Sequence, residues 1–199
     1  MPLAQIMKKI TEELDQKDAA REKIFSGSRQ IIRLTRQSVA LLHHNEQRKA
    51  SVLIQEALKE LKKLSKVSEE YPELYYGGIL TPAQQEIAEA AILESLVDGR
   101  DFPQFDESLI SPSAYLLGMA DAVGELRRLC LDYLRALGLK EAKESFSQME
   151  EIYQALVEVD YPSGLTPGLR HKVDTARRLV EENRTDVTRA QLLLRASRK

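Results

Sequence analysis

The stretch that decides the fold lies at residues 115–128 and reads YLLGMADAVGELRR. Its apolar side chains recur at helical spacing, so the sequence predicts a helix that is largely buried. Within it, Asp121 and Glu125 are four positions apart, which puts their carboxylates one turn apart on one face, about 6 Å along the axis. Carboxylates on a buried helix need a partner, a proton or a metal ion. The small residues Gly118 and Gly124 would let a neighbouring backbone come close.

A second pair of acids lies on the helix predicted for residues 81–98. Glu86 and Glu89 are three positions apart and therefore share a face that continues into apolar side chains. Because they lie in the early turns, they could simply favour the positive end of the helix dipole. Together with Asp121 and Glu125 they could instead converge as oxygen ligands. Oxygen-only ligation suits a hard cation such as Mg²⁺ or Mn²⁺.

A basic stripe marks the long helix predicted for residues 3–44. Arg29, Arg33 and Arg36 follow one another at i, i+4 and i+7, so they share one face, and Arg21 adds to the local excess of base. Guanidinium groups suit bidentate phosphate contacts, and such a row could follow a nucleic-acid backbone without reading its sequence. The alternative is a solvated helix face whose arginines pair with acids elsewhere.

The histidines favour no metal site on their own. His43 and His44 continue the arginine stripe, but adjacent residues on a helix point in different directions, so they are poor joint ligands. A structural or phosphate-contacting role fits them better. His171 has neither an acidic residue nor another histidine at ligand spacing.

Capping residues and periodicity predict helices along the whole chain. Beyond the helix over 3–44, the expected ranges are about 47–69, 81–98, 112–137, 139–159, 166–182 and 185–196. Thr81 and Ser111 are expected N-caps, each followed by proline, and Gly138 is the expected residue just past the central helix. The sequence contains no β-alternating run, glycine-rich phosphate loop or paired-cysteine motif. These patterns predict one all-α domain over residues 1–199.

Composition narrows the class of protein further. The chain of 199 residues is 43% hydrophobic and 30% charged, and its net charge of −2 argues neither for nor against nucleic acid. No apolar run reaches the length of a membrane span and the first residues lack a secretory signal, so a soluble, cytoplasmic protein without a membrane partner is expected. Cys130, the single cysteine, cannot form an intramolecular disulfide and is expected to be buried.

Three stretches make the sequence resemble the translin family, and in particular its branch of translin-associated factor X (TRAX). They are YLLGMADAVGELRR at 115–128, REKIFSGSRQIIRLTRQSVALLHH at 21–44 and YPELYYGGILTPAQQEIAEA at 71–90. The resemblance implies an all-α bundle of about seven helices and a closed, hollow oligomer, usually an octamer, that encloses RNA. The chain is shorter at its N-terminus than TRAX, and without a separate translin subunit we expect it to assemble with itself.

The same resemblance implies a catalytic activity. TRAX carries its nuclease acids as ExxE on one helix and DxxxE on the helix that corresponds to residues 115–128, a full set that translin lacks. The matching positions here, expected both to bind Mg²⁺ (or Mn²⁺) and to act in catalysis, are Glu86, Glu89, Asp121 and Glu125. The implied reaction is Mg²⁺-dependent hydrolysis of phosphodiesters in single-stranded RNA by an endoribonuclease. The implied nucleic-acid contacts come from Arg21, Arg29, Arg33 and Arg36.

Three other functions fit parts of the sequence. The first is a translin-like oligomer that binds RNA or single-stranded DNA without catalysis, its acids forming salt bridges with Arg127 or Arg128. The second is a di-iron carboxylate bundle, which normally requires an ExxH element that neither acid pair provides. The third is a structural helical adaptor. Metal-dependent cleavage of RNA would separate the nuclease from all three.

Overall fold

The computed structural model describes residues 2–104 and 106–196, and over these residues the chain is all-helical. The seven helices there are α1 (Leu3–His43), α2 (Gln47–Glu69), α3 (Pro72–Tyr76), α4 (Thr81–Val97), α5 (Pro112–Arg135), α6 (Leu139–Val157) and α7 (Leu169–Ala196). The predicted all-α fold class is confirmed. Within this part of the chain, no helix combines the length and apolar character needed to cross a membrane.

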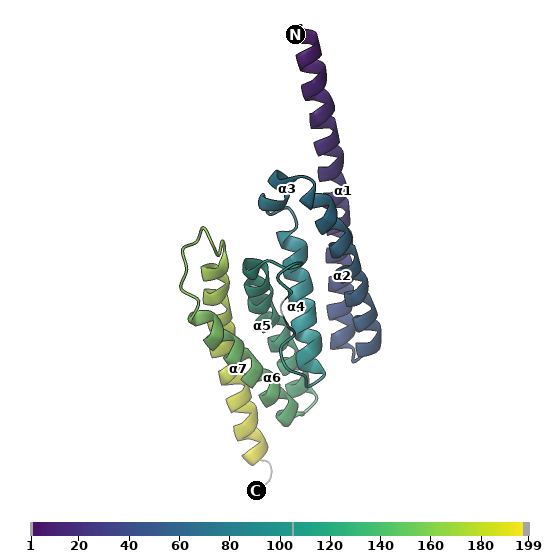
Figure 1. The fold of residues 1–199 in the computed structure, drawn as a ribbon. Coiled ribbons are helices and arrows are strands. Elements are labelled where there is room, and N and C mark those ends of the chain that lie inside the picture. Colours follow the sequence, from purple (N-terminus) through teal and green to yellow (C-terminus); the bar gives the residue numbers. More distant parts are fainter. Residues whose placement is uncertain (1, 105, 197–199) are drawn as a thin grey trace.

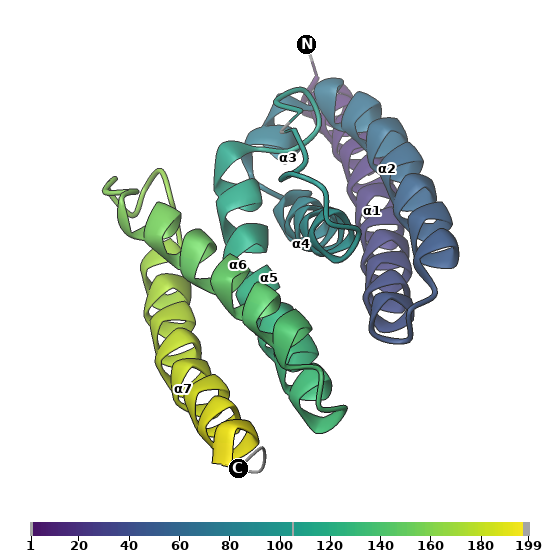
Figure 2. The same cartoon turned by 90° about the horizontal axis from the view of Figure 1, so that it is seen from below.

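The helices form a row of layers. The antiparallel pair α1 and α2 packs on α4, α4 packs on α5, and α6 and α7 cover the other side of α5 (Figure 1). Seen from below, the same order runs from α2 and α1 across α4 and α5 to α7 (Figure 2). The N-terminal part of α1 extends past the rest of the molecule. Helices α4 and α5 are therefore central, with other helices packed on either side of the pair.

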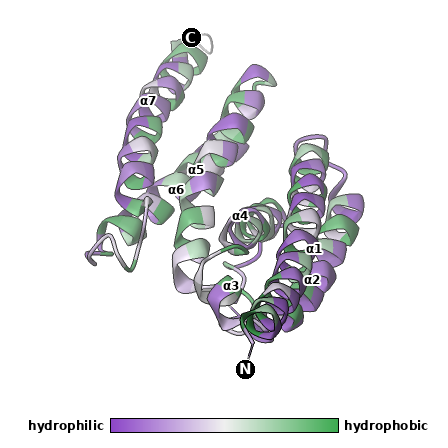
Figure 3. Ribbon diagram, turned by 90° about the horizontal axis from the view of Figure 1, so that it is seen from above, coloured by the Kyte–Doolittle hydropathy of each residue, from purple (hydrophilic) through white to green (hydrophobic). Residues whose placement is uncertain are grey.

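Two apolar clusters hold these layers together. The first lies between α1, α2 and α4 and contains Ile24, Ile31, Leu61 and Ile87, all without exposed surface. The second lies between α4, α5, α6 and α7, where the fully buried side chains include Leu93, Val123 and Met149. Each buried aliphatic side chain of this size contributes about 1.5–3 kcal/mol. Seen from above and coloured by hydropathy, α4 stands enclosed between the α1/α2 pair and α5 (Figure 3).

Helices α4 and α5 approach most closely at Gly118. A Cβ atom at this position would lie 2.5 Å from the Gln85 carbonyl oxygen and 2.8 Å from the Glu89 backbone nitrogen. Those contacts are shorter than van der Waals separation, so glycine is required for the crossing. Gly124 was also predicted to permit a close approach, and that prediction is wrong. Its nearest neighbour would be Leu179 Cδ1, at an ordinary 4.0 Å.

Two of the expected helix ends differ in the structure. Helix α4 begins at Thr81 with Leu80 in the N-cap position, so Thr81 is not the cap, although Pro82 does lie in the first turn. Past the end of α5, the left-handed residue is Leu137, with φ of 61°, whereas Gly138 has φ of −82°. Leu137 N–H donates to Leu134 O and Gly138 N–H to Tyr133 O, the paired bonds that close a helix end in this way.

Other local predictions are confirmed. Ser111 caps α5, because its hydroxyl oxygen accepts a hydrogen bond from Ala114 N at 3.3 Å. Cys130 is buried and its thiol donates to Ala142 O.

The predicted break in the last helical region is absent. Asn183 was expected to separate two helices, but α7 runs unbroken through it from Leu169 to Ala196. The side chain of Asn183 is fully buried, and its Nδ2 donates to Met149 Sδ on α6 at 3.3 Å. Asparagine favours turns when its side chain bonds the local backbone. Here the side chain faces another helix, so the helix continues.

Candidate metal and nucleic-acid site

The four predicted acids lie on the two helices that cross at Gly118. We call Glu86, Glu89, Asp121 and Glu125 the acid cluster. Asp121 lies one turn after the crossing on α5 and Glu125 a further turn along, while the backbone of Glu89 is part of the contact itself. The close approach therefore explains why carboxylates from two separate sequence blocks come into one region. Each helix is buried on its apolar side, and the acids lie where the buried surface meets solvent.

Glu89 is the most strongly perturbed member of the acid cluster. Burial, and after it the negative charges of Asp121, Glu86 and Glu125, together raise the pKa of its carboxyl group to about 8. The ammonium group of Lys172 acts in the opposite sense. At neutral pH the Glu89 carboxyl is therefore mostly protonated in the absence of an added cation. A cation bound nearby would favour its ionised form.

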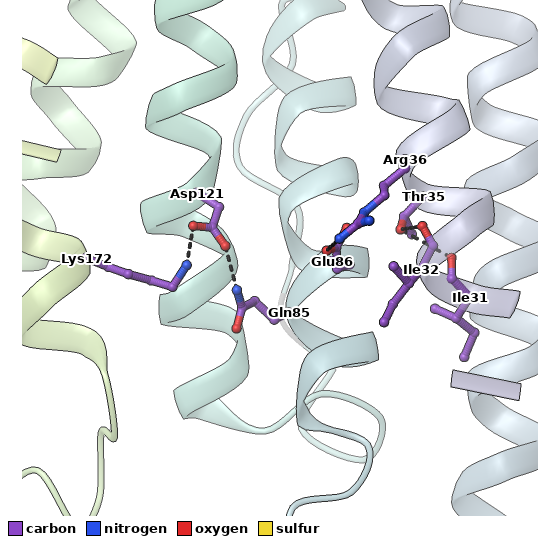
Figure 4. A network of polar contacts seen from close by, with 8 residues as sticks. All are labelled: Ile31, Ile32, Thr35, Arg36, Gln85, Glu86, Asp121 and Lys172. Atoms are coloured by element: carbon purple, nitrogen blue, oxygen red, sulfur yellow. Dashed lines mark hydrogen bonds and ion pairs between the residues drawn. The ribbon is translucent and has the colours of Figure 1, made fainter. Parts of the chain in front are cut away.

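Asp121 is held from both sides by other helices. Gln85 Nε2 on α4 donates to Asp121 Oδ2 at 2.6 Å, and Lys172 Nζ on α7 forms an ion pair with Asp121 Oδ1 (Figure 4). The lysine is 29% exposed and the aspartate 27%. Since both partners come from outside α5, the carboxylate is fixed by tertiary packing and not by its own helix.

Glu125 pairs with the end of α1. His43 Nε2 donates to Glu125 Oε2 at 2.5 Å, and Arg128 Nη1 lies 3.9 Å from the same oxygen. The hydrogen bond from His43 holds the pKa of Glu125 below its usual value. The His43 side chain is only 3% exposed, and its Nδ1 has no hydrogen-bond partner within the described residues. This confirms a structural role for His43, directed at a carboxylate.

Glu86 points away from the other three acids. Its Oε1 accepts from Arg36 Nη2 on α1 at 3.3 Å, on the opposite side of α4 from the Asp121 contacts (Figure 4). In keeping with this, no three Asp, Glu, His or Cys side chains among residues 2–104 and 106–196 are close enough to hold one metal ion. Shared ligation by all four acids therefore remains a prediction: Glu86 must turn from Arg36, and the other three side chains must also come closer together.

The acid cluster nevertheless fits a hard divalent cation chemically. Its donors are all carboxylate oxygens, the ligand type that Mg²⁺ and Mn²⁺ prefer. Burial and the acidic neighbours raise the pKa of Glu89, so this carboxyl group would gain from a nearby cation. Each of the other three acids pairs with a side chain from α1 or α7. Glu86 pairs with Arg36, Glu125 with His43 and Asp121 with Lys172.

The predicted nucleic-acid residues divide into two groups. Arg29, Arg33 and Arg36 are exposed and line a shallow hollow of about 400 Å³ on α1, and we call these three the arginine face. The hollow borders one member of the acid cluster, because Arg36 contacts Glu86. Arg21 lies two turns before Arg29 and is engaged with Asp18 and Glu22. The structure does not bring Arg21 to the arginine face.

Sequence reasoning missed two residues that organise the acid cluster, namely Gln85 and Lys172. For His43 it predicted a structural or phosphate-contacting role on the face of α1 that carries Arg36, but not its partner Glu125. Lys172 is 51 residues from Asp121 in the chain and looks like any exposed lysine on an amphipathic helix. Arg127, considered as a partner of the acids, pairs instead with Glu182 and Asp186.

A layered all-α fold with paired acids on two crossing helices defines the class of protein. The chain belongs to the translin family, whose family model matches residues 19–183. It is also 32% identical over 176 residues to an uncharacterized protein of Methanocaldococcus jannaschii, covering 87% of this chain and 78% of that protein. The family prediction made from the sequence is thereby confirmed.

Solved structures support the same assignment. Two structures of AfC3PO, one of them a complex with duplex RNA, are 33% identical to this chain, with a TM-score of 0.87. In each, the match covers 94% of this chain and 97% of the other. The structure of apo-NeC3PO, at 19% identity and a TM-score of 0.80, matches over 96% of this chain and 98% of its own and supports the fold.

Proposed function

We propose that this translin-family protein is a Mg²⁺-dependent endoribonuclease that hydrolyses phosphodiester bonds in single-stranded RNA. The observation that carries the proposal is the gathering of carboxylates around the partly buried Glu89 at the α4–α5 crossing. Burying polar and charged groups costs free energy of folding. A helix contact with a purely structural role would therefore not be stabilised by a protonated acid placed among three others. Strongly perturbed carboxyl groups of this kind are typical of catalytic sites.

Each acid has a proposed role. Glu86, Glu89 and Asp121 would hold Mg²⁺ (or Mn²⁺), and Glu125 would complete the ligand set or orient the attacking water. A bound divalent cation supplies activation of a water ligand and neutralises charge on the phosphate. His43 would keep the Glu125 carboxylate oriented through its hydrogen bond. The same four positions favour the TRAX branch of the family, which carries this set of acids.

The arginine face would position the substrate. Its guanidinium groups are exposed on α1, and Arg36 reaches Glu86, so a phosphate backbone bound there would lead toward the acid cluster. Contacts of this type give weak sequence preference and strong dependence on salt. We further propose that the chain acts in the cytoplasm as a homo-oligomer, with an octamer as the first assembly to test. The family resemblance implies a closed assembly around RNA.

Cleavage of labelled RNA tests the proposal directly. Parent protein and Glu89→Gln, which keeps the shape of the side chain, are incubated with single-stranded and duplex RNA in Mg²⁺ or in EDTA. Both substrates are included because AfC3PO has been solved with duplex RNA. Glu144→Gln is the matched control, since Glu144 is exposed and pairs only locally with Lys140.

The proposal predicts products from single-stranded RNA only with Mg²⁺, and at least about a hundredfold slower cleavage by Glu89→Gln. Equal rates for Glu89→Gln and the parent protein would contradict it. Binding without cleavage under every condition would favour a non-catalytic, translin-like nucleic-acid-binding oligomer. The observation that favours this second function is that Arg36, His43 and Lys172 already partner three of the acids.

A further inference from the structure

Lys172 connects the last helix of the chain to the acid cluster. It lies in the first turn of α7, directly after the loop of residues 158–168, and its ammonium group pairs with Asp121 Oδ1. The other carboxylate oxygen of Asp121 accepts from Gln85 (Figure 4). Both oxygens that Asp121 could offer to a cation therefore already have partners, one of them a positive charge.

This ion pair differs from the surface pairs of the molecule. Lys140 and Glu144 form a pair one turn apart on α6, with exposures of 83% and 61%. The side chains of Lys172 and Asp121 are both less than one-third exposed and come from different helices. Reduced contact with water strengthens an ion pair. It also means that removing one partner leaves the other charge unpaired away from water, which costs free energy. The Lys172–Asp121 pair thus satisfies a carboxylate that would otherwise lack a counterion.

The ammonium group also lies where it would compete with a metal ion. A divalent cation that uses Asp121 as a ligand would lie beside the Lys172 ammonium group on the same carboxylate, and the two positive charges would repel each other. Lysine carries its charge on a flexible four-carbon chain, so it can leave one oxygen without movement of the helix backbone. Exchange of the ammonium group for a divalent cation would keep Asp121 neutralised throughout.

We infer that Lys172 is an internal counterion of Asp121 that a divalent cation displaces, so that metal binding at the acid cluster frees the side chain of Lys172 at the start of α7. This inference rests on the proposed metal site. It assigns to Lys172 a positioning role: the residue sets the affinity of the site for metal and keeps Asp121 paired when metal is absent. It does not make Lys172 a metal ligand.

Direct metal binding tests the exchange without any measurement of cleavage. The full chain is titrated with Mn²⁺ in the absence of RNA, and free Mn²⁺ is followed by electron paramagnetic resonance. Lys172→Met and Lys172→Gln remove the competing charge, whereas Arg170→Met removes the same charge from an exposed residue two positions earlier in the chain. We expect Mn²⁺ to bind at least about fivefold more tightly to both Lys172 variants, and Arg170→Met to change affinity much less.

The possible results separate the inference from the proposed function. Absence of Mn²⁺ binding to the parent protein would overturn the metal site itself. Binding to the parent protein with equal or weaker binding to both Lys172 variants would overturn the exchange and leave the metal site standing. An equal gain in Arg170→Met would also overturn it, because a general change in charge would then explain the effect.

A second measurement uses the parent protein and does not depend on how the Lys172 variants fold. Brief acetylation of amines, read lysine by lysine with mass spectrometry, reports how free each ammonium group is. Saturating Mn²⁺ should increase the modification of Lys172 several-fold and leave Lys140 unchanged. In Asp121→Asn, Lys172 should react quickly with or without Mn²⁺. Unchanged modification of Lys172 in the parent protein at saturating Mn²⁺ would contradict the exchange.

Discussion

The acid cluster and the arginine face place charge in opposite settings. At the α4–α5 crossing, the carboxylates are partly buried, their partners come from other helices, and the pKa of Glu89 is raised to about 8. On α1, the guanidinium groups stand in solvent along one helix. Partial burial fixes geometry and shifts ionisation, whereas exposure leaves charge mobile and screened by salt. The comparison suggests a site for chemistry beside a surface for binding.

The largest expected effect comes from closing the space between α4 and α5. Gly118→Ala would place a methyl group 2.5 Å from the Gln85 carbonyl oxygen, so the helices must move apart. We expect the free energy of unfolding to fall by about 1–3 kcal/mol or more, as for other overpacked core positions, and metal binding to weaken. Urea denaturation measures the first effect.

Gly124→Ala is the matched control for this substitution. A Cβ atom there meets nothing closer than 4.0 Å, so alanine should stabilise α5 by about 0.5–1 kcal/mol through helix propensity. Equal effects of the two substitutions would show that the crossing does not depend on Gly118.

The next prediction concerns the pH dependence of stability. The pKa of Glu89 rises from 4.5 to about 8 on folding, so between these values the folded state keeps a proton that the unfolded state has lost. Stability from this group therefore decreases as pH rises from about 4.5 to 8. Glu89→Gln should be more stable than the parent protein above pH 8, by about 1–3 kcal/mol, and equally stable near pH 4.

Urea denaturation of both proteins at pH 4, 6 and 8.5, with EDTA present, measures this difference. Since Asp121, Glu86 and Glu125 contribute to the shift, Glu125→Gln should move the apparent pKa of Glu89 downward. A difference in stability between Glu89→Gln and the parent protein that does not vary with pH would contradict the assigned ionisation of Glu89.

A smaller effect is expected on the arginine face. Arg33→Gln should weaken RNA binding several-fold and lower the slope of log affinity against log salt concentration by about 0.7, the value for one lost phosphate contact with a single strand. Fluorescence anisotropy at several salt concentrations measures both. Arg21→Gln should change the slope less, since Arg21 is paired with Asp18 and Glu22. A larger effect of Arg21→Gln would return that residue to the binding surface.

The smallest effect concerns the end of α5. Leu137 is 75% exposed and adopts the left-handed conformation with φ of 61°. Leu137→Gly should therefore relieve backbone strain and stabilise the protein by about 1 kcal/mol or less, measured by thermal denaturation. Leu139→Gly, inside the first turn of α6, is expected to destabilise instead. Destabilisation by Leu137→Gly would show that its conformation carries no strain.

Most of the secondary structure could be predicted because helical signals are local. The apolar period of α2 predicted its bounds, and Ser111 followed by proline predicted the start of α5. The failures have a common cause. The predictions for Asn183 and Gly138 rested on residue preferences that hold when nothing else contacts the segment. A buried contact with Met149 outweighed the preference of Asn183 for a helix break, and the hydrogen bonds that close α5 put Leu137 and not Gly138 in the left-handed conformation.

By itself, the sequence determined the all-α class, the spacing of the four acids on two helices and the row of arginines on α1, because each depends on residues within a few turns of one another. Only the tertiary structure decided that Gly118 and not Gly124 forms the crossing, and that Glu86 faces Arg36. It also decided that His43 and Lys172, which are 82 and 51 residues from their carboxylates, complete the acid cluster. Side-chain partners so distant in the chain are set by how helices pack, and packing depends on the whole fold.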